Sequence, residues 1–231
     1  MARGYTAHGP AHDNNLEASV GSTLYLSNPI TIAAKIYGAG VDVDGCCWFG
    51  VSKRDTAGHW AILWDTSTYA NGRIQYQVWG GAGDSVWCLD DTDFIQDRWY
   101  SVVARTRATN DHELDIYDLT ADRTANDTTS FTPFITELTS PYYVQGGVAG
   151  ESNRGMEGYW AETAVWSVAL TDAEVASYQA GYSPLLVRPE GLVFYEPSFR
   201  DLKADQIGGK TMAEPGTVVA FPHPPGIIYK E

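Results

Sequence analysis

The chain has 231 residues, and its composition excludes several classes of function. Lys and Arg number 15 against 29 Asp and Glu, which gives a formal net charge of -14 at pH 7. Nucleic acids and anionic membrane surfaces are bound through clustered Lys and Arg, so we expect neither partner. No apolar run is long enough to span a bilayer, and the first fifteen residues lack the apolar segment of a secretory signal. We therefore expect a protein that is made in the cytoplasm of its host.

Short strand-like runs follow one another along most of the chain. They cover residues 22–26, 30–37, 46–53, 59–66, 73–80, 99–107, 112–119, 142–150 and 159–166. Many of them alternate: Ile74, Tyr76 and Val78 are separated by polar residues, as on a strand with one buried and one solvated face. Polar turns such as Asn71-Gly72 separate the runs. This pattern predicts an all-β fold of two packed antiparallel sheets.

A single helix is predicted at 171–180. Thr171 and Glu174 have the spacing of a capping box, and Leu170 and Val175 occupy the positions of a hydrophobic staple around it. Gly181 follows as a helix stop. The helix is short, so we expect it to pack on the rim of the sandwich.

The composition changes near both ends of the chain. We divide the sequence into an N-terminal arm at 1–19, a sandwich at 20–182 and an extended C-terminal segment at 183–231, which holds seven of the eleven prolines. This segment also carries apolar runs, which must be buried against another protein surface. We predict that at least its final part, residues 218–229, docks on a neighbouring subunit or another protein, and the alternative is that Leu192–Tyr195 adds a strand to its own sandwich. The predicted docking residues are Leu192, Phe194, Tyr195, Phe221, Pro224 and Ile227.

The stretch from Gly158 to Gly181, GYWAETAVWSVALTDAEVASYQAG, carries a resemblance to a known family. It resembles the closing strand and helical turn of laminin-G-like domains in the concanavalin A-like lectin and glucanase superfamily. The runs WYSVVARTR and HELDIYDL resemble paired strands of the same family. The resemblance implies a concanavalin A-like jelly-roll β-sandwich with one short helix and an extended Pro-rich C-terminal arm. Domains of this superfamily bind sugars, bind proteins, hydrolyse glucans or build assemblies.

Three acidic residues, Glu113, Asp115 and Asp118, lie in the sequence ELDIYD. The spacing resembles the signature of glucanases with this fold, which implies a nucleophile, an assisting Asp and an acid/base. A retaining mechanism needs two carboxyls on one face. Glu113 and Asp115 share a face on a regular strand, whereas Asp118 needs a bulge to join them. We predict an ordinary solvated strand face and no enzyme, and keep the glucanase as an alternative.

Aromatic residues offer a second kind of site. Trp60, Trp64 and Trp79 are the candidates for a platform on which a sugar stacks, which requires flat rings exposed beside polar groups. The alternative is that they are core or interface residues. Exposure of these rings in a cleft would favour sugar binding, and burial would favour a scaffolding role.

Asp42 and Asp44 precede Gly45 and supply hard oxygen ligands of the type that calcium prefers. An EF-hand-type loop also needs a Glu at its twelfth position, and that position is Lys53. We therefore predict no cofactor, with calcium at Asp42 and Asp44 as the alternative.

Proteins with a sandwich of this type, no signal peptide and such a tail resemble virion proteins of tailed bacteriophages. The first hypothesis is a non-enzymatic structural protein of a virion, such as a capsid decoration or cement protein. Its expected partners are a major capsid protein and further copies of itself in a homo-oligomer. The second hypothesis is a carbohydrate-binding or receptor-binding module that recognises cell-surface glycans, and a β-glucanase is the third.

Overall fold

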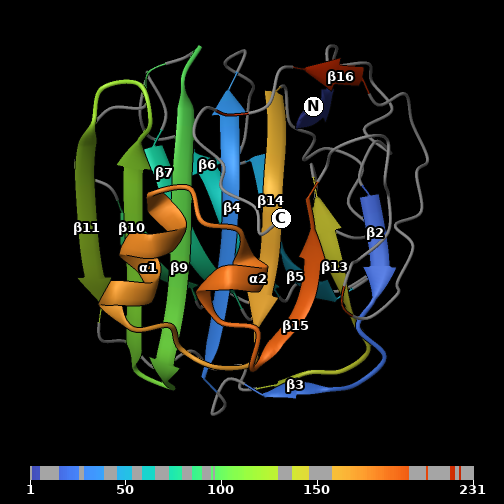
Figure 1. The fold of residues 1–231 in the computed structure, drawn as a ribbon. Helices are drawn as coiled ribbons and strands as arrows, with labels where there is room; N and C mark the ends of the chain where they lie inside the picture. Colours follow the sequence, from blue (N-terminus) through green and yellow to red (C-terminus); the bar gives the residue numbers. More distant parts are fainter. Residues whose placement is uncertain are drawn as a thin grey trace.

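Two antiparallel sheets lie face to face, and two short helices cover the outer face of one of them (Figure 1). The computed structural model describes residues 2–5, 16–25, 29–38, 46–53, 59–65, 73–79, 85–89, 95, 97–129, 137–145, 158–197, 207, 219–221 and 224. None of the helices in this described part of the chain is long and apolar enough to cross a membrane.

The larger sheet has eight strands in the order β11-β10-β9-β4-β14-β1-β16, with β15 also paired to β14. Its strands are β1 (Ala2–Tyr5), β4 (Ile30–Gly38), β9 (Trp99–Ala108), β10 (Asp111–Asp118), β11 (Arg123–Thr129), β14 (Gly158–Trp166), β15 (Leu192–Glu196) and β16 (Val219–Phe221).

The second sheet has six strands in the order β2-β13-β5-β6-β7-β8. Its strands are β2 (Leu16–Ser19), β5 (Cys46–Lys53), β6 (His59–Asp65), β7 (Arg73–Trp79), β8 (Ser85–Leu89) and β13 (Pro141–Gln145). A separate two-stranded ribbon pairs β3 (Leu24–Tyr25) with β12 (Glu137–Leu138).

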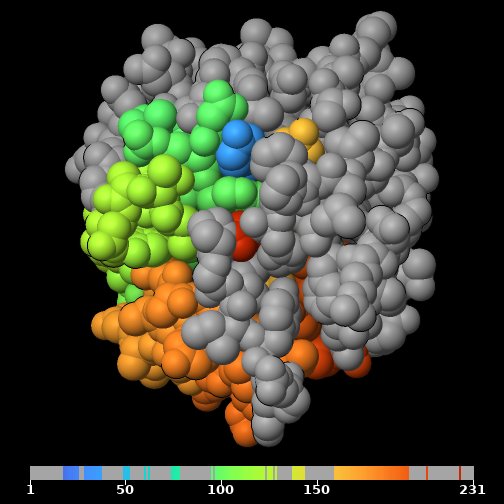
Figure 2. Space-filling view, turned by 45° about the horizontal axis from the view of Figure 1, so that its top comes forward, coloured from blue at the N-terminus to red at the C-terminus, as the bar shows by residue number. Residues whose placement is uncertain are grey.

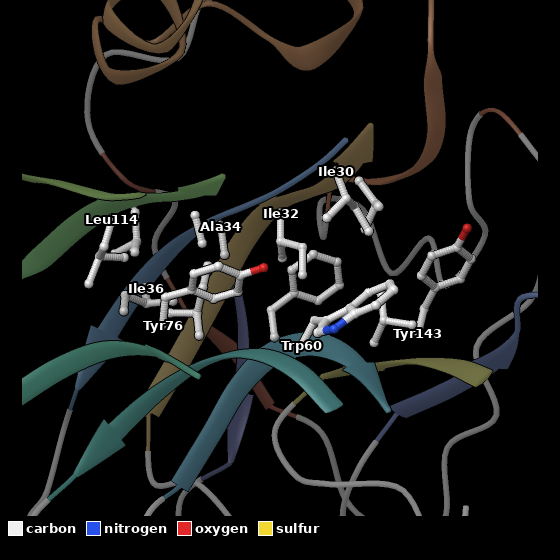
Figure 3. Close-up of a cluster of buried hydrophobic side chains, with 14 of the residues drawn as sticks. Ile30, Ile32, Ala34, Ile36, Trp60, Tyr76, Leu114 and Tyr143 are labelled. Atoms are coloured by element: carbon white, nitrogen blue, oxygen red, sulfur yellow. The ribbon is translucent and has the colours of Figure 1, made fainter. Parts of the chain in front are cut away.

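The main core lies between the two large sheets. Period-two alternation places Ile30, Ile32, Ala34 and Ile36 of β4 in this core, where they meet aromatic side chains from the six-stranded sheet. Figure 3 shows this cluster, with Leu114 and Ile36 at one end and Ile30, Trp60 and Tyr143 at the other. The predicted pair of packed antiparallel sheets is confirmed.

A second core forms on the outer face of the larger sheet, beneath α1 (Asp172–Gln179) and α2 (Pro184–Val187). Ala33, Val103 and Trp166 point to this side of the sheet and pack against Val175 and Tyr178 of α1. Figure 2 shows the segment from α1 to β15, in orange, against the green strands β9 to β11. The helix therefore covers a sheet face rather than the rim that the sequence suggested.

The predicted capping box of α1 is confirmed, because Thr171 and Glu174 each accept a hydrogen bond from the other's backbone N–H. The second helix was not predicted. Ser183 caps it and Pro184 occupies its first turn, where the missing N–H of proline is harmless. One turn of helix therefore interrupts the segment that was predicted to be extended.

Both flanking segments supply strands to the sandwich. From the predicted N-terminal arm, β1 pairs with β14 and β16, and β2 pairs with β13. From the C-terminal segment, β15 pairs with β14 and β16 pairs with β1. The sheets therefore extend beyond both ends of the predicted 20–182 unit.

Candidate functional site

A pocket of about 490 Å³ opens at one end of the sandwich, near β3 at the lower end of Figure 1. Its lining comes from strands of both large sheets and from the β3–β12 ribbon, so no single segment encodes it. The described lining residues are Val20, Ser22, Leu24, Tyr25, Pro29, Ile30, Trp60, Tyr143, Val165, Trp166, Ser167 and Val193. The volume lies in the range of small-molecule binding sites.

The pocket changes in polarity from its inner end to its mouth. Ile30, Trp60, Tyr143 and Val165 are buried members of the main core, and they give the inner end an apolar and aromatic wall. In Figure 3, Ile30, Trp60 and Tyr143 lie next to one another at this end of the core.

The residues at the mouth are accessible to solvent. Ser22, Pro29 and Ser167 are exposed, and the side chain of Tyr25 is 47% exposed. A ligand that enters here meets hydroxyl groups first and apolar groups deeper in the pocket.

The ribbon that carries Tyr25 is held at the edge of the pocket by local backbone geometry. Gly21 has a φ of +81°, which turns the chain between β2 and β3. The Val20 N–H donates to the Pro141 carbonyl at 2.9 Å. Leu24 and Tyr25 then pair with Leu138 and Glu137. The exposed Tyr25 is thus placed at the mouth by contacts that do not involve its own ring.

Strand β15 contributes to the pocket and to the packing behind it. Val193 lines the pocket, and the next residue, Phe194, is buried between two aromatic rings. Its ring stacks on Tyr143 at 4.3 Å between centroids and on Phe49 at 5.9 Å. The stack fixes the position of Tyr143, because its ring packs on Phe194, which is fully buried, as is Phe49 on the other side of Phe194.

Of the three tryptophans considered for a sugar platform, only Trp60 has a described side chain, and it is not exposed. Trp60 is only 2% exposed, because its side chain is part of the main core and only borders the pocket. Trp64 and Trp79 lie on β6 and β7, and their side chains fall outside the described residues. The exposed aromatic ring at the pocket is Tyr25, which the sequence analysis did not select.

The predicted carboxylates Glu113 and Asp115 do share one face of β10. They do not face an open cleft, because both form ion pairs with the buried Arg105 of β9, at 2.7 and 2.9 Å. Asn126 of β11 donates to both carboxylates at 2.7 Å. Arg107 also pairs with Glu113. These contacts explain the ELD sequence as part of a structural ion cluster.

The cluster also reaches the helix. Arg105 Nη1 donates to the Leu170 carbonyl at 2.9 Å and to Asp172 Oδ1 at 2.8 Å. The hydrogen bond and charge of Arg105 lower the pKa of Asp172. Burial raises the pKa of Asp115 against the opposing effect of Arg105. The charged side chains of the cluster therefore hold α1 on the sheet.

Asp118 does not join the other two carboxylates. β10 pairs with β11 in unbroken register from His112 to Asp118, so the bulge that Asp118 required is absent from this stretch. Its carboxylate instead pairs with Arg98 at 2.8 Å and accepts from the N–H groups of Thr120 and Ala121. Burial opposes the charge of Asp118, but these donors outweigh it and lower its pKa.

The candidate calcium ligands Asp42 and Asp44 lie outside the described residues. Within the described ranges, no group of three or more His, Cys, Asp and Glu side chains could hold a metal ion.

The predicted docking residues of the C-terminal segment pack inside the molecule. Leu192 and Tyr195 are buried beneath α1, and Phe194 is buried between the sheets. These three residues are therefore not available to a partner, and for them the alternative holds, a strand added to the chain's own sandwich.

The remaining docking residues lie further along the chain. Phe221 is on β16, which pairs with β1 of the same chain, and Pro224 is buried. Ile227 lies outside the described residues.

A family model described as the concanavalin A-like lectin/glucanases superfamily matches residues 10–176. The chain belongs to this superfamily. The resemblance inferred from the sequence is thereby confirmed. Among curated proteins, none matches the chain.

Solved structures with a similar fold come from several kinds of protein. The enzymatically active domain of tailspike protein 2 of bacteriophage CBA120 is 12% identical with a TM-score of 0.57, and the match covers 84% of this chain and 34% of that one. A pentraxin of Limulus polyphemus is 12% identical with a TM-score of 0.57, covering 94% and 93%. A candidate carbohydrate-binding protein of Bacteroides ovatus is 14% identical with a TM-score of 0.54, covering 91% and 61%. The chain spans about a third of the tailspike proteins it matches.

Proposed function

We propose that this chain is a non-enzymatic binding module that holds a glycan in the pocket at the end of the sandwich. The observation that carries the proposal is the combination of an exposed tyrosine ring, two hydroxyls at the mouth and an aromatic inner wall in one pocket of about 490 Å³. Sugars present both hydroxyl groups and apolar ring faces, so a pocket that offers both kinds of partner suits them. The similar fold of the candidate carbohydrate-binding protein from Bacteroides ovatus agrees with this ligand class.

The arrangement of the acidic residues supports the non-enzymatic part of the proposal. Glycoside hydrolysis needs two carboxyls placed on either side of a bound substrate. Glu113 and Asp115 are engaged by Arg105, and Asp118 is engaged by Arg98. We therefore expect no hydrolysis of β-glucans. Activity that disappears in Glu113→Gln would restore the glucanase hypothesis.

The binding part is tested by titrating glycans into the wild type and into Tyr25→Ala. Tyr182→Ala is the matched control, because Tyr182 is similarly exposed, at 43%, but is absent from the pocket lining. We expect Tyr25→Ala to weaken binding by about tenfold, the loss of one aromatic contact of about 1–1.5 kcal/mol. Equal affinity in all three proteins would argue that glycans do not use this pocket.

A second candidate is a bacteriophage virion component, either a capsid decoration or cement protein or a receptor-binding module. It is favoured by the similar fold in two tailspike structures, with TM-scores of 0.57 and 0.56. In this candidate the partners are a major capsid protein and further copies of the chain. Mass spectrometry of purified particles from the encoding organism tests it. Stoichiometric amounts in intact particles would support it, and absence from them would oppose it.

A further inference from the structure

We infer that the group buried at the inner end of the pocket is the methyl group of an uncharged sugar, as in a 6-deoxyhexose or an N-acetylated hexosamine. The inference rests on the proposed glycan-binding function and adds the feature by which the pocket selects among glycans. It follows from the charge of the lining and from the order of apolar and polar groups along it, and Val193 provides a way to test it.

The lining disfavours a charged ligand. None of the described residues that line the pocket is acidic or basic. The chain as a whole carries a formal charge of -14. An anionic sugar would thus enter an apolar pocket against a repulsive field and without a cation to pair with. Sialic and uronic acids are therefore poor ligands.

The inner end also disfavours a sugar that is hydroxylated at every position. Ile30, Val165 and Trp60 present aliphatic carbon and an aromatic ring there, and all three are buried. A sugar hydroxyl pressed against the aliphatic carbon of Ile30 and Val165 would lose its hydrogen bonds to water without replacement. A methyl group in the same place has no hydrogen bonds to lose, and its transfer from water into the apolar pocket is favourable.

The mouth provides partners for the opposite side of the sugar. Ser22, Ser167 and Tyr25 all line the pocket and are exposed. The Ser167 hydroxyl donates to the Gly191 carbonyl at 3.2 Å, which leaves its oxygen as an acceptor. A methyl-bearing sugar can therefore point its methyl group inward and keep its hydroxyls at the mouth.

Val193 offers a way to alter the polarity of the lining with little change in shape. It is partly buried, packs against the main core and lines the pocket from β15. Val193→Thr replaces one methyl with a hydroxyl and keeps the β-branched shape that suits a strand. Val187→Thr is the control, because Val187 of α2 is also partly buried but packs against the core beneath α1 and does not line the pocket.

The experiment measures Kd by isothermal titration calorimetry on the full chain with matched pairs of sugars. The pairs are L-fucose with L-galactose, L-rhamnose with L-mannose, and N-acetyl-D-glucosamine with D-glucose, with N-acetylneuraminic acid as the charged probe. The first two pairs differ only in a methyl or hydroxymethyl group. We expect at least one methyl-bearing sugar to bind at least about fourfold tighter than its partner, the ratio given by burying one methyl group. We also expect no binding of the charged probe.

In Val193→Thr the preference for the methyl-bearing sugar should fall towards parity, whereas Val187→Thr should keep it. Tyr25→Ala, at an exposed position that is safe for folding, should weaken every sugar that binds. Equal affinity within every pair would overturn the inference and leave the proposed function standing. An unchanged preference in a folded Val193→Thr protein would also overturn it. If no sugar binds, the proposed function itself fails, and this inference fails with it.

Discussion

Arg105 of β9 and Asp172 of α1 form a hydrogen-bonded ion pair of 2.8 Å that ties the first turn of the helix to the sheet. Arg105 is buried and uses its other terminal nitrogen for Glu113 and Asp115 of β10. One guanidinium thus joins two strands and a helix. The carboxylates of Glu113 and Asp115 on β10 are largely buried, so the positive charge of Arg105 is needed to stabilise their ionised forms.

The first prediction is that Arg105→Met strongly destabilises the protein. The substitution leaves Asp115 without its buried counter-charge and Glu113 with only the partly exposed Arg107, which costs about 3–5 kcal/mol. At this chain length the loss corresponds to a fall of about 6–20 °C in Tm. The control is Arg188→Met, because the pair between Arg188 and Glu174 is partly exposed and longer, at 3.4 Å. Calorimetry that gave both variants the same small change in Tm would refute the structural role of the cluster.

The second prediction concerns the start of α1. Thr171→Ala removes the hydroxyl that accepts from the Glu174 N–H, so the free energy of unfolding should fall by about 1 kcal/mol. The expected change in Tm is about 2–4 °C. Thr120→Ala, at an exposed turn, should stay within about 0.5 kcal/mol of the wild type. A thermal scan in which the two variants coincide would contradict the importance of the capping box.

The third prediction is a dependence of stability on pH from Lys35, which is buried under α1. Its ammonium donates to the Tyr178 carbonyl at 3.2 Å and lies 5.0 Å from the centre of the Tyr178 ring. Burial lowers the pKa of Lys35 to about 8, although the charge of Glu162 opposes the shift. Glu162 is itself buried and accepts from the Tyr195 hydroxyl at 2.8 Å.

Because the pKa of Lys35 is lower in the folded state, the unfolded state holds more protons between pH 8 and 10.5, and stability should rise with pH in that window. The gain should be on the order of 1–3 kcal/mol. It should be measured up to about pH 9.5, before tyrosines ionise. Denaturant titrations of the wild type and Lys35→Met should show the rise in the wild type alone. A rise of the same size in Lys35→Met would assign the effect to other groups.

The fourth prediction is that the C-terminal strand is needed for the fold. Phe194→Ala removes the middle ring of the stack between Tyr143 and Phe49, and the cavity should cost about 3–5 kcal/mol. Leu185→Ala is the control on the same segment, because Leu185 is 43% exposed. Urea midpoints measure both changes. A folded Phe194→Ala protein as stable as Leu185→Ala would mean that β15 packs less tightly than described.

The sequence was informative where the structure depends on neighbouring residues. The residues of the capping box, Thr171 and Glu174, lie three positions apart, and Ile74, Tyr76 and Val78 share one face of a strand because of its pleat. The expected solvated face is not found, because Gln75 and Gln77 are also buried. Such features are local, so the nine predicted strand regions and α1 could be located before the structure was known.

The sequence was less informative where distant segments meet. The pairing of Gly4 with Tyr159 closes a loop of more than half the chain, and neither residue carries a signal for the other. Strand β11 was missed because its sequence, RTANDTT, is polar except for Ala125, which packs against the main core. Such strands are specified by the neighbours on which they pair, which a single sequence does not reveal.

The candidate site contains residues that the sequence could suggest and residues whose role depends on contacts between distant segments. Trp60 was selected as an aromatic residue, but only its packing partners determine that the ring is buried. Tyr25 was missed because its exposure results from the ribbon formed with Glu137, far along the chain. The acidic ELD sequence suggested catalysis because Arg105, the residue that neutralises it, lies on the neighbouring strand.

The most direct test of the account is to locate the bound sugar by NMR on the labelled full chain. Amide shifts should be followed while the tightest-binding glycan is titrated. We predict that the largest shifts occur at Val20, Ser22, Ser167 and Val193 around the pocket, and that the amide signals of Arg105 on β9 and Asp172 in the first turn of α1 stay unchanged. Shifts concentrated on the outer face of the larger sheet, with the pocket residues unchanged, would contradict it.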